Sequence, residues 1–292
     1  MTETYFKVWE IVRKELYHFI KLHNISKVNY TFEPYFNYIT KKYKIKILPH
    51  HFSDEAILGL TLIDKLGISF SYETESNPNR QNFTKCHELG HLVLQHSGTV
   101  FAENAQNQDW QEKEANYFSS FILMPDIILL TKIVYQQITF QDLARELKVS
   151  SQALEIRLED FLFFRSHYPK EQIKEAIYHY KTRKSALLIQ LMQSFKTKII
   201  QEYEAITVKD IEYFKKYLTE TDFITNQEIP ALADPEFQTT IKEQFKQCRV
   251  SAYYDKGLTI WYSWNTQMLS DKDSRRKAKL KHYEIQNQGT SQ

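Results

Sequence analysis

Residues 82–98 read Asn-Phe-Thr-Lys-Cys-His-Glu-Leu-Gly-His-Leu-Val-Leu-Gln-His-Ser-Gly. Within this stretch His87 and His91 are four residues apart, so on a helix both imidazoles lie on one face, one turn from each other. Two neutral imidazoles at this spacing can bind one Zn²⁺, and the carboxylate of Glu88 beside them can accept a proton from water. The His-Glu-x-x-His pattern therefore predicts a catalytic zinc site, provided that the flanking sequence supports it.

The segments flanking the motif predict an α+β fold that is mainly helical. Apolar residues at helical spacing predict helices at 5–22 and 34–43, and three short strand patterns follow at 44–48, 57–63 and 68–72. A small mixed β-sheet is therefore expected directly before the motif helix. Asn82 is the expected N-cap of that helix and Gly98 its expected C-terminal glycine.

A catalytic zinc site needs a third protein ligand, and a helix predicted at about 110–124 offers two candidates. Asp109 and Glu112 form a predicted capping box at its start, which gives Glu112 a role at the helix end. Glu114 precedes Tyr117 by three residues, so we expect it to project inward with the apolar stripe of this helix. Glu114 is therefore preferred to Glu112 as the third ligand. His96, five residues past His91, lies off the ligand face and is interpreted as a helix-end residue.

The composition is that of an ordinary soluble protein. The chain has 292 residues with a formal net charge of +2, so no strong field toward nucleic acid or membrane is implied. Its two cysteines, Cys86 and Cys248, are too few and too far apart for a disulfide framework and fit a reducing compartment. No signal peptide or membrane-spanning stretch is predicted, which indicates a cytoplasmic protein.

Residues 139–162 have the pattern of two short helices joined by a turn, as in DNA-reading units. The second helix is expected to bury Leu154 and Leu158. Its other face would then be acidic, with Arg157 as its one cation for phosphate contacts. A structural or substrate-docking role is therefore favoured over DNA binding.

The C-terminal half divides into a domain and a tail in this interpretation. A Tyr-Pro-Lys stretch near residue 168 predicts a boundary, so that a first domain spans 1–165 and a mostly helical second domain spans 166–270. Strands at 249–254 and 258–264 predict an aromatic β-hairpin. The basic, polar stretch 271–292 is expected to be disordered. A sensory or substrate-recognition role is the interpretation for the second domain.

The motif stretch, together with Glu-Ala-Asn-Tyr-Phe-Ser-Ser-Phe-Ile-Leu-Met-Pro at 114–125, resembles the ImmA/IrrE metallopeptidases. The resemblance extends over roughly residues 25–160. It implies a zincin-like catalytic domain and a zinc endopeptidase of the gluzincin type, with His87, His91 and Glu114 as ligands and Glu88 as general base. Cys86 departs from the family, where a small apolar residue such as Ala is expected, and places a thiol next to a ligand. Oxidation of that thiol is a hypothesis for disturbing the zinc site.

Members of this family typically cut a helix-turn-helix transcriptional repressor of a mobile element or stress response. The resemblance thus implies such a repressor as the substrate. The alternative is a non-catalytic regulator that binds protein or DNA and in which the zinc site is structural or vestigial.

Overall fold

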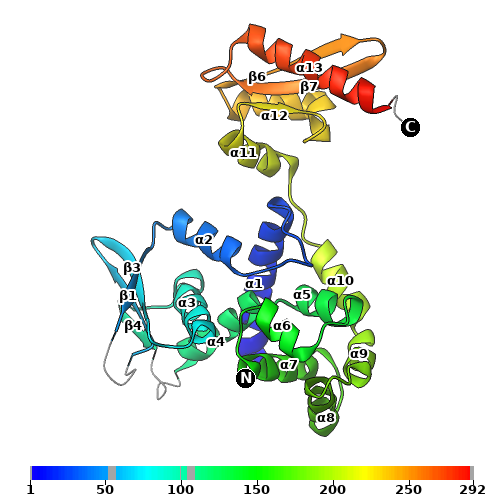
Figure 1. Ribbon diagram of the computed structural model, residues 1–292. Coiled ribbons are helices and arrows are strands. Elements are labelled where there is room, and N and C mark those ends of the chain that lie inside the picture. Colours follow the sequence, from blue (N-terminus) through cyan, green and yellow to red (C-terminus); the bar gives the residue numbers. More distant parts are fainter. Residues whose placement is uncertain (1, 52–56, 99, 104–108, 290–292) are drawn as a thin grey trace. The chain divides into compact units, whose positions relative to one another are not determined.

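The computed structural model describes residues 2–51, 57–98, 100–103 and 109–289 (Figure 1). The chain divides into two compact units, residues 1–207 and residues 208–292. Separate hydrophobic clusters fill the two units. The expected α+β class, mainly helical with small sheets, is confirmed.

The first unit is built mostly from helices. They are α1 (Thr2–Leu22), α2 (Glu33–Lys42), α3 (Pro78–Val93), α4 (Trp110–Leu123), α5 (Asp126–Leu130), a π-helical turn η2 (Thr131–Tyr135), α6 (Phe140–Glu146), α7 (Ser151–Arg165), α8 (Lys170–Lys181), α9 (Ala186–Gln193) and α10 (Lys196–Glu204). Their apolar side chains recur at helical spacing, and one continuous cluster of them extends from Tyr5 to Tyr203.

A four-stranded mixed sheet precedes and follows the motif helix α3. Its strands are β1 (Lys46–His50), β2 (Gly59–Asp64), β3 (Gly67–Glu73) and β4 (Val100–Glu103), in the spatial order β1-β3-β2-β4. β1 runs parallel to β3, and the other pairs are antiparallel. The predicted mixed sheet is confirmed, with the addition of β4 after the motif.

Helix α3 begins earlier than its sequence suggested. Asn77 is the N-cap, because its side chain accepts a hydrogen bond from the amide of Asn79, and Pro78 follows at the first helical position. Asn82, the predicted cap, lies inside the helix, and its side-chain amide donates to the carbonyl of Lys148. The prediction was wrong because two asparagines offered the same cap chemistry and the earlier one is followed by proline.

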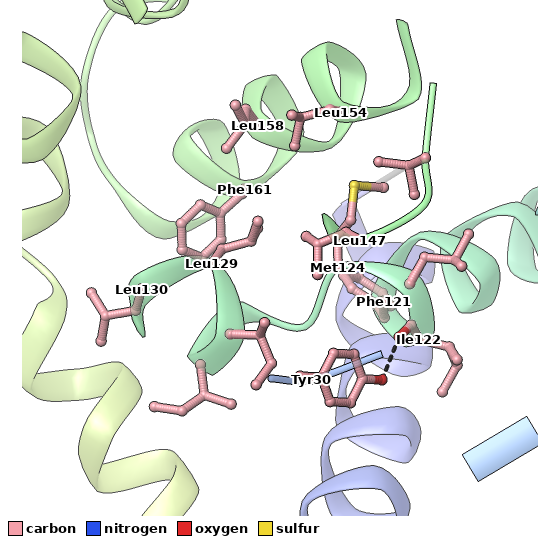
Figure 2. Close-up of a cluster of buried hydrophobic side chains, with 14 of the residues drawn as sticks. Tyr30, Phe121, Ile122, Met124, Leu129, Leu130, Leu147, Leu154, Leu158 and Phe161 are labelled. Atoms are coloured by element: carbon pink, nitrogen blue, oxygen red, sulfur yellow. Dashed lines mark hydrogen bonds between the residues drawn. The ribbon is translucent and has the colours of Figure 1, made fainter. Parts of the chain in front are cut away.

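Close packing joins α3 to α4. A Cβ atom on Gly90 would lie 3.1 Å from a ring carbon of Phe118, so the absence of a side chain lets the two helices approach. The core continues behind α4, where the hydroxyl of Tyr30 donates to the carbonyl of Ile122 at 2.6 Å. Figure 2 shows Leu154, Leu158 and Phe161 of α7 directed toward this core. The expected burial of Leu154 and Leu158 is confirmed.

Helices α6 and α7 form the predicted two-helix unit. Thr139 and Ser150 cap them by accepting hydrogen bonds from the amides of Asp142 and Ala153. Arg157, which the sequence offered for phosphate contacts, is 1% exposed. Its guanidinium donates to the carboxylate of Asp126 and to the carbonyl of Met124. Arg157 is therefore committed to the core and is not available to a nucleic acid.

The carboxylate of Asp126 connects several helices of the first unit. It accepts hydrogen bonds from Arg157 and Arg165 on α7 and from the indole N–H of Trp9 on α1. Burial alone would raise the pKa of Asp126, but the two guanidinium groups outweigh it and hold that pKa below its usual range. Arg165 also donates to Glu202 of α10 at 2.9 Å, which links α10 to the same network.

The domain boundary lies at residue 207, not at 165. Helices α8, α9 and α10 bury Ile177, Leu188 and Ile199 in the same cluster as the helices that precede them. The Tyr-Pro-Lys stretch marks only a turn between α7 and α8. The predicted boundary is wrong because the apolar pattern of 170–204 shows that these helices bury a face, but not against which core.

The second unit contains a three-stranded sheet and helices. Its elements are α11 (Asp210–Glu220), β5 (Phe223–Thr225), a 3₁₀ turn η3 (Pro230–Ala233), α12 (Pro235–Gln244), β6 (Cys248–Asp255), β7 (Leu258–Asn265) and α13 (Asp271–Gly289). The sheet order is β5-β7-β6, all antiparallel. The predicted aromatic hairpin is confirmed as β6 and β7, and Tyr262 and Trp264 are buried within it.

The tail predicted to be disordered forms helix α13 over 271–289, whereas 290–292 lie outside the described residues. Ser274, Ala278 and His282 recur every four residues and are each fully buried. The ring of His282 contacts the carbonyl of Asp255 at 2.8 Å. The disorder prediction was wrong because the buried residues of this helix are small or polar and lie between basic residues. The sequence therefore shows no apolar pattern that would indicate a buried helix face.

Among the described residues no single helix has the length and hydropathy to cross a membrane. One bent pair, Trp110–Leu123 with Asp126–Tyr135, passes that test by length and composition alone.

Candidate metal centre

Three side chains converge where α3 packs against α4. The Nε2 atom of His87 lies 3.0 Å from a carboxylate oxygen of Glu112, and Nε2 of His91 lies 3.1 Å from Nε2 of His87. The second carboxylate oxygen of Glu112 is 3.6 Å from Nε2 of His91. All three residues are buried, and one ligand atom from each lies within 4.8 Å of the others. Two imidazoles and a carboxylate in this arrangement could hold a metal ion.

The third member of this group is Glu112, which corrects the preference for Glu114. Residues two apart on a helix point about 200° away from each other, so only one of these glutamates can face α3. Glu114 instead contacts His96 at 3.1 Å and Lys7 of α1 at 2.6 Å. The predicted capping role did not hold Glu112 at the helix end, because Asp109 caps the helix at the amide of Trp110.

Glu88 directly follows His87 on α3, and its side chain contacts the sheet. Its carboxylate is fully buried and accepts a hydrogen bond from the hydroxyl of Thr61 on β2. A Cβ atom at Gly59 would lie 2.3 Å from the other oxygen of this carboxylate. The lack of a side chain at Gly59 therefore makes room for the Glu88 carboxylate. Neither Thr61 nor Gly59 was singled out in the sequence.

Each histidine has a partner at its second ring nitrogen. Nδ1 of His87 lies 3.1 Å from the side-chain oxygen of Asn116, one helical turn after Glu112. Nδ1 of His91 lies 2.9 Å from Nδ1 of His96. Such contacts orient a metal-binding imidazole and leave Nε2 directed at the centre. Asn116 was not singled out in the sequence, where the spacing Glu-x-x-x-Asn at 112–116 is the signal that could have indicated this role.

Electrostatics favour a neutral imidazole at His91. Burial, followed by the neighbouring His87 and His96, lowers the pKa of His91 to about 2. Burial also lowers the pKa of His96, although Glu114 acts in the opposite direction. An uncharged imidazole offers the lone pair that a metal needs, so the protein environment suits a His₂Glu ligand set of the kind that binds Zn²⁺.

A cavity of about 780 Å³ opens from the metal group. His87 and Glu112 lie at its wall, and α3, α4 and α7 supply the remaining sides. The lining combines apolar side chains with side-chain amides; it includes Phe83, Tyr117, Met124, Ile156, Asn79 and Gln152. Such a lining can accept an apolar side chain and hydrogen-bond a peptide backbone.

Comparison with protein families gives one match, and it spans all three residues of the metal group. A search of curated proteins found no significant match to the chain. The model of Peptidase_M78, described as an IrrE N-terminal-like domain, matches residues 40–159, which include the strands β1 to β4, the motif helix α3, and helices α4 to α6 with most of α7. Residues 40–159 of this chain thus match the IrrE N-terminal-like domain, in agreement with the resemblance found in the sequence.

Proposed function

We propose that the chain is a zinc-dependent endopeptidase that hydrolyses a peptide bond in a protein substrate. The observation that carries this proposal is the convergence of His87, His91 and Glu112, together with the buried carboxylate of Glu88 on the same helix as the two histidines. Three protein ligands leave a coordination position open, as a catalytic zinc site requires and a structural site does not.

The proposed chemistry divides between the metal and Glu88. Zinc bound at this site supplies Lewis-acid chemistry, which polarises a peptide carbonyl and makes water a nucleophile near neutral pH. Glu88 accepts a proton from the attacking water and delivers it to the leaving amine. The hydrogen bond from Thr61 and the space at Gly59 hold the Glu88 carboxylate in position for both transfers.

For the substrate we propose a helix-turn-helix repressor. The family resemblance supports this choice, and the cavity beside the metal group is large enough to take side chains on either side of a scissile bond. Incubation of the purified zinc-loaded chain with candidate helix-turn-helix repressors, followed by mass spectrometry of the fragments, tests the proposal. An intact repressor, with no cleavage of any candidate protein, would contradict it.

The decisive variant is Glu88→Gln, which keeps the shape of the side chain but removes its basicity. We expect it to bind one zinc ion per chain and to lose cleavage by at least about 100-fold, because general-base catalysis contributes on that order. Zinc content by elemental analysis and cleavage rate are the two measurements. The matched control is Glu175→Gln on the exposed face of α8, which should leave both unchanged. Full activity of Glu88→Gln would rule out its role as the base.

A further inference from the structure

His96 connects the metal group to a second pair of charged side chains. It follows the end of α3 and is 7% exposed, and its ring lies between two partners. Nδ1 faces Nδ1 of His91 at 2.9 Å, and Nε2 faces a carboxylate oxygen of Glu114 at 3.1 Å. The other oxygen of Glu114 accepts from the ammonium of Lys7 at 2.6 Å. A continuous series of side-chain contacts therefore runs from Lys7 on α1 through Glu114 and His96 to His91.

Hydrogen-bond rules fix where the protons lie along this series of contacts. A carboxylate in a salt bridge with Lys7 can only accept, so the proton between Glu114 and His96 belongs to Nε2 of His96. A neutral His96 then has a lone pair at Nδ1, so Nδ1 of His91 must carry the proton between the two rings. His91 is thereby left with a bare Nε2, which is the atom that faces His87 and Glu112.

We propose that His96 and Glu114 are positioning residues that hold His91 in the one tautomer able to bind a metal through Nε2. This inference rests on the proposed function, because it assigns the purpose of the arrangement to the zinc site. It also gives a role to Glu114, the carboxylate that the sequence favoured as a ligand: it acts two contacts away from the metal group.

Lys7, the last residue in this series of contacts, lies outside the segment that matches the peptidase family. Lys7 is on α1, and it also lies over the ring of Trp110 at 5.5 Å. Helix α1 therefore supplies more than packing to the first unit: it supplies the cation that holds the carboxylate of Glu114 between Lys7 and His96.

Zinc affinity, measured by competition with a chromogenic chelator, tests the proposal without a substrate. His96→Ala removes the acceptor for Nδ1–H of His91, and we expect zinc binding to weaken about 10- to 100-fold. His96→Asn places an amide oxygen near the former Nδ1 position, so it should restore most of the affinity. His179→Ala on α8, a partly buried histidine outside the metal group, is the control and should bind zinc as the parent does.

Glu114→Gln distinguishes action through His96 from direct ligation. If Glu114 acts only through His96, Glu114→Gln weakens zinc binding in the parent but adds nothing in the His96→Ala background. Glu112→Gln should weaken zinc binding more than Glu114→Gln or His96→Ala does, because it alters a proposed ligand. Equal affinities for His96→Ala and the parent, or additive losses in the double variant, would overturn the proposal.

A second measurement separates this proposal from the zinc site itself. In the metal-free chain, ¹⁵N chemical shifts of the His91 ring should report a protonated Nδ1 and a bare Nε2, and His96→Ala should shift this population toward the other tautomer. The reverse assignment in the parent would overturn the inference. A parent chain with this tautomer that binds no zinc would instead contradict the proposed function. Thermal unfolding of each variant identifies any that fail to fold.

Discussion

At the scale of single residues, the position of the Glu88 carboxylate depends on the absence of a side chain at Gly59. Glycine is required there by close approach and not by backbone conformation, since a Cβ atom would lie 2.3 Å from the Glu88 carboxylate and 2.6 Å from the methyl group of Thr84. Thr61, two residues later and on the same face of β2, donates to the same carboxylate. Alternate residues of one strand therefore shape the site of the proposed base.

We predict that Gly59→Ala displaces Glu88 and leaves the three ligand candidates in place. Cleavage should fall about 100-fold, because a displacement of about 1 Å at a catalytic group costs that much. Zinc content should stay at one ion per chain. Thr61→Ala, which removes only the hydrogen bond, should have a smaller effect. Cleavage rate and elemental analysis of the folded variants are the measurements, and an unimpaired Gly59→Ala enzyme would contradict the prediction.

The sequence predicted part of this site and misassigned another part, for a physical reason. His87, Glu88 and His91 follow from helical spacing, because all three belong to one helix. The choice between Glu112 and Glu114 depended on how α4 is rotated against α3, which neighbouring residues did not reveal. His96 was interpreted only as a helix-end residue, because helical spacing does not apply to it: Gln95 has a φ of 56°, which redirects the backbone before His96.

For Cys86 the sequence suggested a chemical role that the structure does not favour. The sequence placed a thiol beside a ligand and raised the hypothesis of oxidation. In the structure Cys86 is fully buried, and burial raises the pKa of its thiol well above the usual value. Since the thiolate is the reactive form, this environment favours the role of a small packing residue.

At the scale of elements, α7 has two faces with different uses. One face buries Leu154, Arg157 and Leu158 against the core of the first unit. The other carries Gln152 and Ile156, which line the cavity beside His87 and Glu112. A DNA-reading helix needs cations on its free face, and this face offers an amide, an apolar side chain and carboxylates. The element therefore suits a wall of a substrate cleft better than a DNA-reading helix.

We predict that Ile156→Lys impairs cleavage of a protein substrate and leaves zinc binding intact. Ile156 is 54% exposed and lines the cavity, so a charged side chain there introduces a group that an apolar substrate residue cannot accommodate. We expect kcat/KM to fall at least about 10-fold, an effect of the size seen for a mismatched pocket. Glu159→Lys, on the same helix but not in the cavity wall, is the control.

The alternative role for α7 predicts a different pattern. If the unit read DNA, Ile156→Lys would add a cation and strengthen retention of the chain on duplex DNA at low salt. Cleavage that is equal in the two variants, together with such retention, would contradict the assignment of α7 to the substrate cleft.

At the scale of the whole molecule, the chain has two compact units, each with its own sheet and its own hydrophobic clusters. Local patterns predicted most of the helices and strands, because amphipathic spacing and cap residues are local properties, but they did not predict β4, β5 or α13. They did not predict which elements share a core. Helices α8 to α10 belong with the peptidase-like segment, and α13 belongs with the hairpin, because side chains distant in sequence meet there.

Two truncations test where the first unit ends. A chain of residues 1–207 keeps the whole first cluster, and we predict that it folds and binds zinc with the affinity of the full chain.

A chain of residues 1–165 loses Ile177, Leu188 and Ile199 from that cluster, together with the ion pair between Arg165 and Glu202. Each large buried side chain contributes about 2–5 kcal/mol, whereas a domain is stable by only about 5–15 kcal/mol. The shorter chain should therefore fail to fold. Circular dichroism during heating and zinc titration of both chains are the measurements; a cooperative transition and zinc binding in the 1–165 chain would return the boundary to residue 165.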